Sequence, residues 1–266
     1  MKCQDIIHIV ERIAPPEYAE NWDNSGFLCG ERDAEITGVL ISLDYTEDTL
    51  KEAVSKGCNM VISHHPFIFS TLSAINSDTP VGRLIMDTCK MGVNVYAAHT
   101  SLDYADGGTN DVLFDLLGLK NKDIFMPVNN FDKGLGRVGY TGSPVRYMDF
   151  VKLVKDKLKL KHIKYIGNPQ VVIHKVALLT GAGAVREFIA QAVKCNADAY
   201  VTGDLKYHDA LDALALGLNI IDGTHFATEI IVCDRLKDMI VEAGGGMIEE
   251  GFVKVTDTGK QPFRYL

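Results

Sequence analysis

The sequence has no Cys-x-x-Cys pair, no apolar run long enough to cross a membrane and no secretory leader pattern. A membrane-spanning helix needs roughly 20 apolar residues, so no transmembrane segment is expected. Residues 1–20 alternate charged and apolar residues at helical spacing up to Pro15 and Pro16, which indicates an amphipathic helix rather than a signal peptide. The six cysteines are typical of free thiols in a reducing compartment, and we therefore expect a cytoplasmic protein.

Basic residues are also scarce, since 27 Lys and Arg face 35 Asp and Glu for a formal net charge of −8. Proteins that hold the nucleic acid backbone neutralise its phosphates with basic residues, so nucleic acid is not expected to be the main partner. The chain has 266 residues, of which 47% are hydrophobic. That is enough for one large α/β domain or two smaller ones with a substantial core.

A strand–helix–strand pattern occurs twice. Residues 38–66 read GVLISLDYTEDTLKEAVSKGCNMVISHHP, and residues 175–210 read KVALLTGAGAVREFIAQAVKCNADAYVTGDLKYHDA. Each copy continues into a further strand that is followed by a histidine and, four residues later, an acid: MGVNVYAAHTSLD (91–103) and LGLNIIDGTHFATE (216–229). Two copies of a β-α-β-α-β unit predict an α/β fold with two similar halves, whose sheets are flanked by helices.

The junction between the halves is expected in residues 121–150, which are rich in Gly, Pro, Asn and Asp. A short strand near Arg137–Tyr140 and a helix from about Tyr147 to Leu160 are predicted there, and a final strand with an extended end closes the chain. We therefore expect a first half at residues 1–126, with the His-His and His-x3-Asp motifs. The second half, residues 127–266, would carry the Gly-rich turn and the His-x3-Glu motif.

Polar side chains follow the predicted strands, where open α/β sheets bind their ligands. His64 and His65 follow one predicted strand. His99 and Asp103 follow a second strand, and His225 and Glu229 follow a third. Imidazoles and carboxylates suit Zn, Fe, Mn or Co, and a carboxylate can bridge two ions. Adjacent histidines beyond a strand end can face one cavity, so the pattern predicts neighbouring metal ions. The alternative is that His64 and His65 are hydrogen-bonded turn residues.

Two further segments are open to two interpretations each. The glycine-rich residues 180–188, TGAGAVREF, either receive an anion on backbone N–H groups or form a tight β-to-α turn, and they lack the Lys-Ser/Thr of a P-loop. Residues 202–210, TGDLKYHDA, place Asp204, Lys206 and His208 after a strand. These side chains either contact substrate or support the metal ligands, or they belong to a solvated loop. We expect His8, His162 and His174 at the surface.

The sequence resembles the GTP cyclohydrolase I type 2 homologue family, the Nif-three-like dinuclear-metal proteins. The matching segments lie in the family's order over nearly the whole chain: WDNSGFLCG (22–30), SLDYTEDTLKEA (42–53), SHHP (63–66), HTSLD (99–103), TGAG (180–183), TGDLKYHDA (202–210) and GTHFATE (223–229). GTHFATE departs from the family's GHxxSE-like run, although the ligand positions are kept.

The resemblance implies a Nif-three-like fold with two divalent metal ions per chain. Their ligands would be His64, His65, Asp103, His225 and Glu229, with Glu229 as the bridge, and His99 would lie beside them as an acid–base group. The resemblance also implies a homohexamer. Longer relatives carry an inserted middle domain, for which the short junction in this chain leaves no room.

The predicted function is metal-dependent hydrolysis of a nucleotide or phosphoester-like substrate. Two metal ions can make hydroxide available at neutral pH and bind transition-state oxygens. In that scheme His99 or His208 moves protons, and the TGAG turn and Lys206 meet phosphate. The alternative is a non-catalytic metal-binding assembly that acts as a carrier, a regulator or a scaffold for partners.

Overall fold

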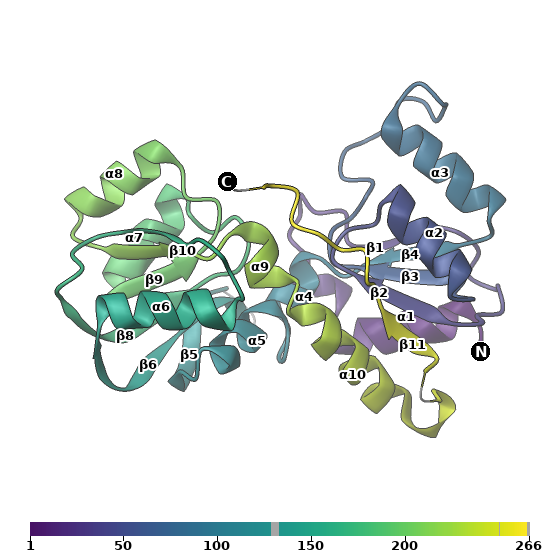
Figure 1. Ribbon diagram of the computed structural model, residues 1–266. Helices are drawn as coiled ribbons and strands as arrows, with labels where there is room; N and C mark the ends of the chain where they lie inside the picture. The colour runs from purple at the N-terminus through teal and green to yellow at the C-terminus, as the bar shows by residue number, and fades with distance from the viewer. Residues whose placement is uncertain (129–132, 250, 265–266) are drawn as a thin grey trace. The chain divides into compact units, whose positions relative to one another are not determined.

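The computed structural model describes residues 1–128, 133–249 and 251–264, which form two compact units (Figure 1). The first unit comprises Met1–Gly108 and Val232–Lys260, and the second comprises Thr109–Ile231 and the chain from Gln261 onward. The sequence predicted one boundary, between residues 126 and 127, whereas the chain passes between the units at three points. The reason is that residues 232–260 return to the first unit before the chain ends in the second.

The sheet of the first unit has the strand order β1-β4-β3-β2-β11, in which β2, β3, β4 and β11 run parallel and β1 pairs antiparallel with β4. Its strands are β1 (Gly26–Cys29), β2 (Val39–Ser42), β3 (Met60–Ser63), β4 (Asn94–Ala97) and β11 (Val253–Val255). Its helices are α1 (Cys3–Ile13), α2 (Glu47–Ser55), α3 (Pro80–Lys90), α4 (Thr100–Tyr104) and α10 (Val232–Gly244), with short 3-10 turns at η1 (Pro16–Tyr18) and η2 (Gly245–Met247).

Helices cover both faces of this sheet: α2 and α3 lie on one side, and α1 and α10 lie on the other (Figure 1). Every residue of β2, β3 and β4 is buried, as expected for strands between two helical layers. Helix α10 packs on α1 and β2, and β11 extends the sheet beside β2. These contacts explain why residues 232–260 belong to the first unit.

The second unit has the strand order β5-β6-β8-β9-β10-β7, with β8, β9 and β10 parallel and the other neighbours antiparallel. Its strands are β5 (Lys120–Pro127), β6 (Gly134–Arg146), β7 (Lys164–Ile166), β8 (Val172–Leu178), β9 (Ala199–Thr202) and β10 (Asn219–Asp222). Its helices are α5 (Thr109–Leu116), α6 (Tyr147–Lys157), α7 (Arg186–Lys194), α8 (Tyr207–Ala215) and α9 (His225–Glu229).

The predicted repeat is confirmed as β2-α2-β3-α3-β4 in the first unit and β8-α7-β9-α8-β10 in the second. The helix expected from about Tyr147 is α6, and the short strand expected near Arg137–Tyr140 is part of the longer β6. Each repeat ends in a short helix after its last strand, α4 or α9. The predicted α/β fold with two similar halves is therefore correct.

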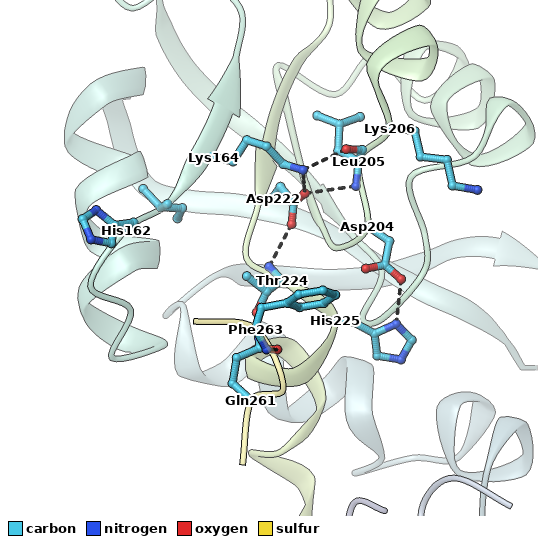
Figure 2. A pocket seen from close by; sticks show the side chains of 11 residues that line it. His162, Lys164, Asp204, Leu205, Lys206, Asp222, Thr224, His225, Gln261 and Phe263 are labelled. Atoms are coloured by element: carbon cyan, nitrogen blue, oxygen red, sulfur yellow. Dashed lines mark hydrogen bonds and ion pairs between the residues drawn. The ribbon is translucent and has the colours of Figure 1, made fainter. Parts of the chain in front are cut away.

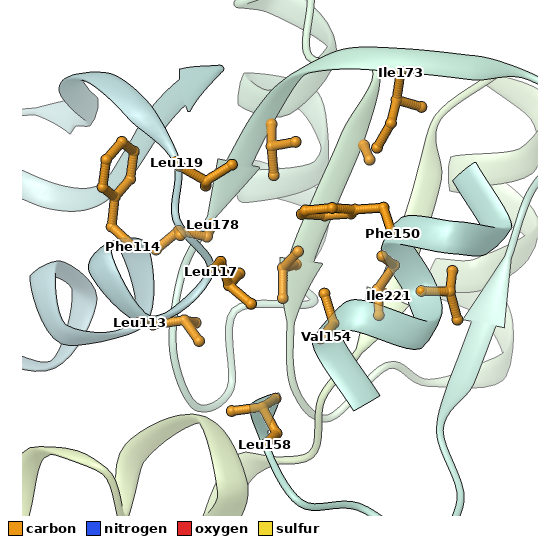
Figure 3. Close-up of a cluster of buried hydrophobic side chains, with 14 of the residues drawn as sticks. Leu113, Phe114, Leu117, Leu119, Phe150, Val154, Leu158, Ile173, Leu178 and Ile221 are labelled. Carbon is orange, nitrogen blue, oxygen red and sulfur yellow. The ribbon is translucent and has the colours of Figure 1, made fainter. Parts of the chain in front are cut away.

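A buried apolar cluster joins α5 and α6 to the sheet of the second unit (Figure 3). Phe150 and Val154, four residues apart on α6, face the sheet together with Leu113 and Phe114 of α5. Burying each large apolar side chain stabilises the fold by about 1.5–3 kcal/mol. The Tyr147 hydroxyl lies 2.8 Å from the carbonyl oxygen of Ile166 and 2.9 Å from that of Ile220, so its polar end is satisfied inside this core.

Among the helices of the described residues, none combines the length and the apolar character needed to cross a bilayer.

Glu52 on α2 holds the segment that follows β11. Its carboxylate accepts hydrogen bonds from the backbone N–H of Asp257 at 2.8 Å and from the hydroxyls of Thr256 and Thr258, and it pairs with Lys56 at 2.6 Å. Burial alone would raise the pKa of Glu52, but these hydrogen bonds outweigh it and lower the pKa from 4.5 to about 2. The carboxylate therefore fixes residues 256–258 against α2.

We predict that Glu52→Gln lowers the free energy of unfolding at pH 7 by about 1–3 kcal/mol, the range for hydrogen bonds to a charged group. A lowered folded-state pKa stabilises the fold above the unfolded value and stops doing so as the pH falls toward the folded value. The difference from wild type should therefore shrink between about pH 4.5 and about pH 2. Urea unfolding at pH 7 and at acid pH measures it.

The control is Glu47→Gln on the same helix, since Glu47 is exposed and pairs only with Lys51 among the ion pairs of the described residues. This variant should unfold like wild type at both pH values. A Glu52→Gln deficit that stays equally large in acid would contradict the role of the Glu52 charge.

Candidate metal centre

Three histidines gather beyond neighbouring parallel strands of the first unit. His64 and His65 directly follow β3, and His99 follows β4 and precedes α4. The ring centroids are 5.0 Å apart for His64 and His65, 5.2 Å for His64 and His99, and 5.6 Å for His65 and His99. One nitrogen from each ring lies within 4.8 Å of the others, which is close enough for one group to hold a metal ion.

The adjacent histidines present their rings to one another although they are successive residues. The N–H of His64 donates to the Ser42 carbonyl at 3.0 Å, and the N–H of His65 donates to the Leu43 carbonyl at 2.9 Å. The backbone of both histidines therefore remains hydrogen-bonded to the end of β2 and the residue after it. The Ser63 hydroxyl donates to the His65 carbonyl at 2.8 Å and forms a turn there. The two imidazoles beyond this turn lie side by side instead of alternating as in a strand.

Each of these imidazoles has an oxygen atom beside its Nδ1. His64 Nδ1 lies 2.9 Å from the Ala98 carbonyl, His65 Nδ1 lies 2.8 Å from Asp44 Oδ1, and His99 Nδ1 lies 2.7 Å from Asp23 Oδ1. An acceptor at Nδ1 places the proton there and makes Nε2 the nitrogen with the lone pair. Metal-binding histidines are oriented in this way, so the donor set fits a divalent transition metal.

Sequence reasoning did not single out Asp23, which contacts His99, or Asp44, which contacts His65. The Asp23 side chain is completely buried. Besides His99, it accepts from the Ser25 hydroxyl at 2.5 Å and from the Thr100 N–H at 3.1 Å and hydroxyl at 2.5 Å. Burial alone would raise the pKa of Asp23, but hydrogen bonds from His99, Ser25 and Thr100 hold it well below its usual range. Asp23 is therefore a buried anion that orients His99.

Asp103 completes the polar group of the first unit. It lies on α4, four residues after His99, with Oδ1 3.7 Å from His64 Nε2. The His-x3-Asp spacing thus carries its carboxylate to the histidines through one turn of helix. All four predicted residues of this unit, namely His64, His65, His99 and Asp103, lie in one place.

In the second unit, His225 and Glu229 lie one helical turn apart on α9. His225 Nε2 is 3.0 Å from Glu229 Oε2, and His225 Nδ1 is 2.8 Å from Asp204 Oδ2. The same arrangement of Nδ1 on a carboxylate is thus present in both units. In each, the aspartate precedes its histidine by 21 residues and follows the neighbouring parallel strand, as Asp44 does for His65.

The TGAG turn supports Glu229. Gly181 has φ +66°, and a Cβ atom there would lie 2.0 Å from Glu229 Oε1, so a side chain would displace the carboxylate. The N–H of Gly181 donates to Thr228 at 3.0 Å, and the N–H of Thr180 donates to Asn110 at 3.1 Å. With these two N–H groups engaged inside the unit, the contacts favour the tight turn over the anion-binding loop.

Two residues of the segment after β9, Asp204 and His208, have different surroundings. Asp204 holds His225, whereas His208 is exposed in the first turn of α8, with its ring 5.3 Å from that of Tyr207. His208 is outside the metal-binding group of the first unit and does not line the cavity beside His225. Its catalytic role stays a prediction.

A cavity of about 510 Å³ lies beside His225 in the second unit (Figure 2). Lys164 pairs with Asp222 at 2.7 Å and donates to the Leu205 carbonyl at 2.8 Å, so its charge is compensated. Lys206 lines the same cavity and forms no ion pair with a described residue. The other lining residues are His162, Ile163, Asp204, Leu205, Thr224, Gln261 and Phe263.

Known proteins resemble the whole chain. The chain is 37% identical to a Clostridium perfringens protein named GTP cyclohydrolase 1 type 2 homolog, over 100% of both chains. A Bacillus subtilis protein of the same name is 28% identical over 99% of this chain and 98% of its own. That alignment has 372 positions against 266 residues here, so it includes positions that this chain lacks.

The fold has solved counterparts as well. The crystal structure of Staphylococcus aureus protein SA1388 superposes with a TM-score of 0.92 at 29% identity, covering 100% of this chain and 99% of the other. The family model described as Duf34/NIF3 (NGG1p interacting factor 3) matches residues 1–258. Together with the paired histidine–carboxylate groups on a duplicated α/β framework, these matches show that the chain belongs to the Duf34/NIF3 family.

Proposed function

We propose that the protein binds two divalent metal ions and uses them to hydrolyse a nucleotide or phosphoester-like substrate. The proposed ligands are His64, His65 and Asp103 in the first unit and His225 and Glu229 in the second. The observation that carries the proposal is that each of the three histidine ligands has an oxygen atom at Nδ1, which assigns the metal-binding role to Nε2. The names of the relatives are consistent with nucleotide chemistry.

Divalent ions at these ligands would supply Lewis acidity and lower the pKa of a water molecule toward neutrality. The protein's own contribution to hydrolysis is positioned proton transfer. Asp23 holds His99 at Nδ1, so Nε2 of His99 can accept or donate a proton. The buried Asp23 anion also stabilises the imidazolium that forms when His99 takes up a proton.

Substrate binding is assigned to the surroundings of these ligands. Lys206 lines the cavity beside His225 and can meet a phosphate oxygen with its ammonium group (Figure 2). Asp204 serves this region indirectly, because it orients His225.

The first prediction of this proposal concerns metal content. Freshly purified, chelator-free protein should carry close to two transition-metal ions per chain, and His65→Ala and Glu229→Ala should each lower that number sharply. Asp44→Asn and Asp204→Asn should weaken metal affinity by about 10- to 100-fold, because each removes a carboxylate from a ligand histidine. Elemental analysis and metal titration measure both effects.

His8→Ala is the control, since His8 is exposed on α1 and bonds only to Gln4 among its hydrogen bonds in the described residues. Its metal content should equal that of wild type. Wild-type protein without metal after chelator-free preparation would rule out the proposed centre.

The second prediction separates an enzyme from a metal-binding assembly. His99→Ala should leave the metal content nearly intact and reduce turnover by about 100- to 10,000-fold, the usual contribution of a positioned acid–base group. Asp23→Asn should reduce turnover in the same direction, because it removes the anion that orients His99. Metal-loaded protein would be screened with GTP, other nucleotides, cyclic nucleotides and phosphoesters.

Activity that is unchanged in His99→Ala and in Asp103→Ala would identify a contaminating hydrolase. Absence of turnover with any metal and any of these substrates would contradict the hydrolase and favour a carrier, regulator or scaffold.

We also propose that the chain assembles into a homohexamer. Leu211 and Leu214 of α8 are each almost half exposed. Neighbouring exposed leucines are typical of a contact surface. Light scattering should give a mass near six times 29.2 kDa, and Leu214→Glu should lower it. A wild-type mass equal to that of one chain would contradict the assembly.

A further inference from the structure

Two large aromatic side chains of the first unit are exposed next to each other. Trp22, the one tryptophan of the sequence, is 61% exposed, and Phe69 is 54% exposed. Their ring centroids are 6.2 Å apart, with the planes inclined by 53°. Most aromatic side chains of this size are largely buried, so an exposed pair is typical of a binding surface. We name Trp22 and Phe69 the aromatic clamp.

The aromatic clamp lies against His99. The Trp22 and His99 centroids are 6.2 Å apart, the Phe69 and His99 centroids are 6.4 Å apart, and both pairs meet edge to face. His99 is in turn within the histidine group of the first unit. A molecule held by the clamp would therefore lie next to the proposed acid–base group.

Residues next to Trp22 and Phe69 form hydrogen bonds that hold the backbone of the aromatic clamp in place. Asp23, the neighbour of Trp22, is bonded to His99 and Thr100. Asn24 Nδ2 donates to the carbonyl oxygen of Ile68, the neighbour of Phe69, at 2.5 Å. Both rings therefore project from anchored backbone. Such preorganisation reduces the conformational entropy that the protein loses when a ligand binds.

We propose that the aromatic clamp binds the planar heteroaromatic ring of the substrate and places its reacting part beside His99. The inference rests on the proposed function and specifies its substrate class, which is a compound with a nucleobase or a similar nitrogen heterocycle. Aromatic side chains stack on the face of any base, and a tryptophan face is large enough to cover one. A phosphoester without such a ring would lack this contact.

The test is a fluorescence titration of metal-replete, full-length protein. Because Trp22 is the one tryptophan, its emission reports on the clamp without a label. GMP and AMP should quench it saturably, whereas ribose 5-phosphate, which lacks the base, should not. Phe69→Ala should raise the dissociation constant for GMP by about 5- to 100-fold, the range for loss of one stacked ring. Calorimetry gives the corresponding value for Trp22→Ala, which has lost the fluorophore.

Phe263 lines the cavity of the second unit, whereas Met247 of the first unit is a largely exposed apolar side chain outside that cavity, so Met247→Ala is the control. It should bind GMP like wild type. Weaker binding in Phe263→Ala with unchanged binding in Phe69→Ala would overturn the clamp in favour of that cavity. Quenching by ribose 5-phosphate to the same extent as by GMP would also overturn it.

The metal content of each variant separates the two proposals. Normal metal content without any nucleotide effect on Trp22 would overturn the clamp and leave the metal centre standing. Emission that changes with protein concentration but not with nucleotide would assign the aromatic pair to a contact between copies of the chain, and would equally overturn the clamp.

Discussion

The parallel pairing of β2, β3 and β4 is the constraint on which the histidine group of the first unit depends. Parallel neighbours bring their carboxyl ends to the same edge of a sheet, so residues that follow different strands become neighbours in space. His64 and His65 after β3 thereby meet His99 after β4 and Asp44 after β2. The buried strands hold this edge rigidly. The polar residues lie beyond the strand ends, so they do not interrupt the apolar core.

The buried carboxylate of Asp23 adds to this arrangement by fixing the orientation of His99. Asp23 is enclosed and anionic, a costly state that persists because Ser25, His99 and Thr100 all donate to it. The same contacts fix the orientation of His99 and the backbone that carries Trp22. One carboxylate thus connects the proposed proton-transfer residue with the proposed ring-binding residue, and this is why a change at Asp23 would affect more than one property.

Both units hold a histidine through a carboxylate, but their other polar residues differ. In both units a carboxylate after one strand holds the Nδ1 of a histidine after the next parallel strand, at 2.8 Å in each case. The first unit adds His64, His99 and Asp103, whereas the second adds Glu229, whose carboxylate would be displaced by a side chain at Gly181. The two histidine–aspartate pairs occupy different positions of the repeat, because His65 follows β3 whereas His225 follows β10, the counterpart of β4. Duplication therefore accounts for the shared strands and for the His-x3-acid spacing of His99 and His225, but not for these pairs.

The sequence by itself determined the α/β class, the repeat, the helix at Tyr147 and the residues that follow each strand, because period and spacing record local backbone structure. The grouping of His64, His65, His99 and Asp103 followed from these, since parallel strands align their ends. Only the tertiary structure decided the contact of Asp23 with His99, which lies 76 residues away, the pairing of Trp22 with Phe69, and the exposure of His208 on α8. It also decided the unit boundaries, because α10 and β11 return to the first sheet. Such contacts join distant residues through packing and buried hydrogen bonds, and no local periodicity encodes them.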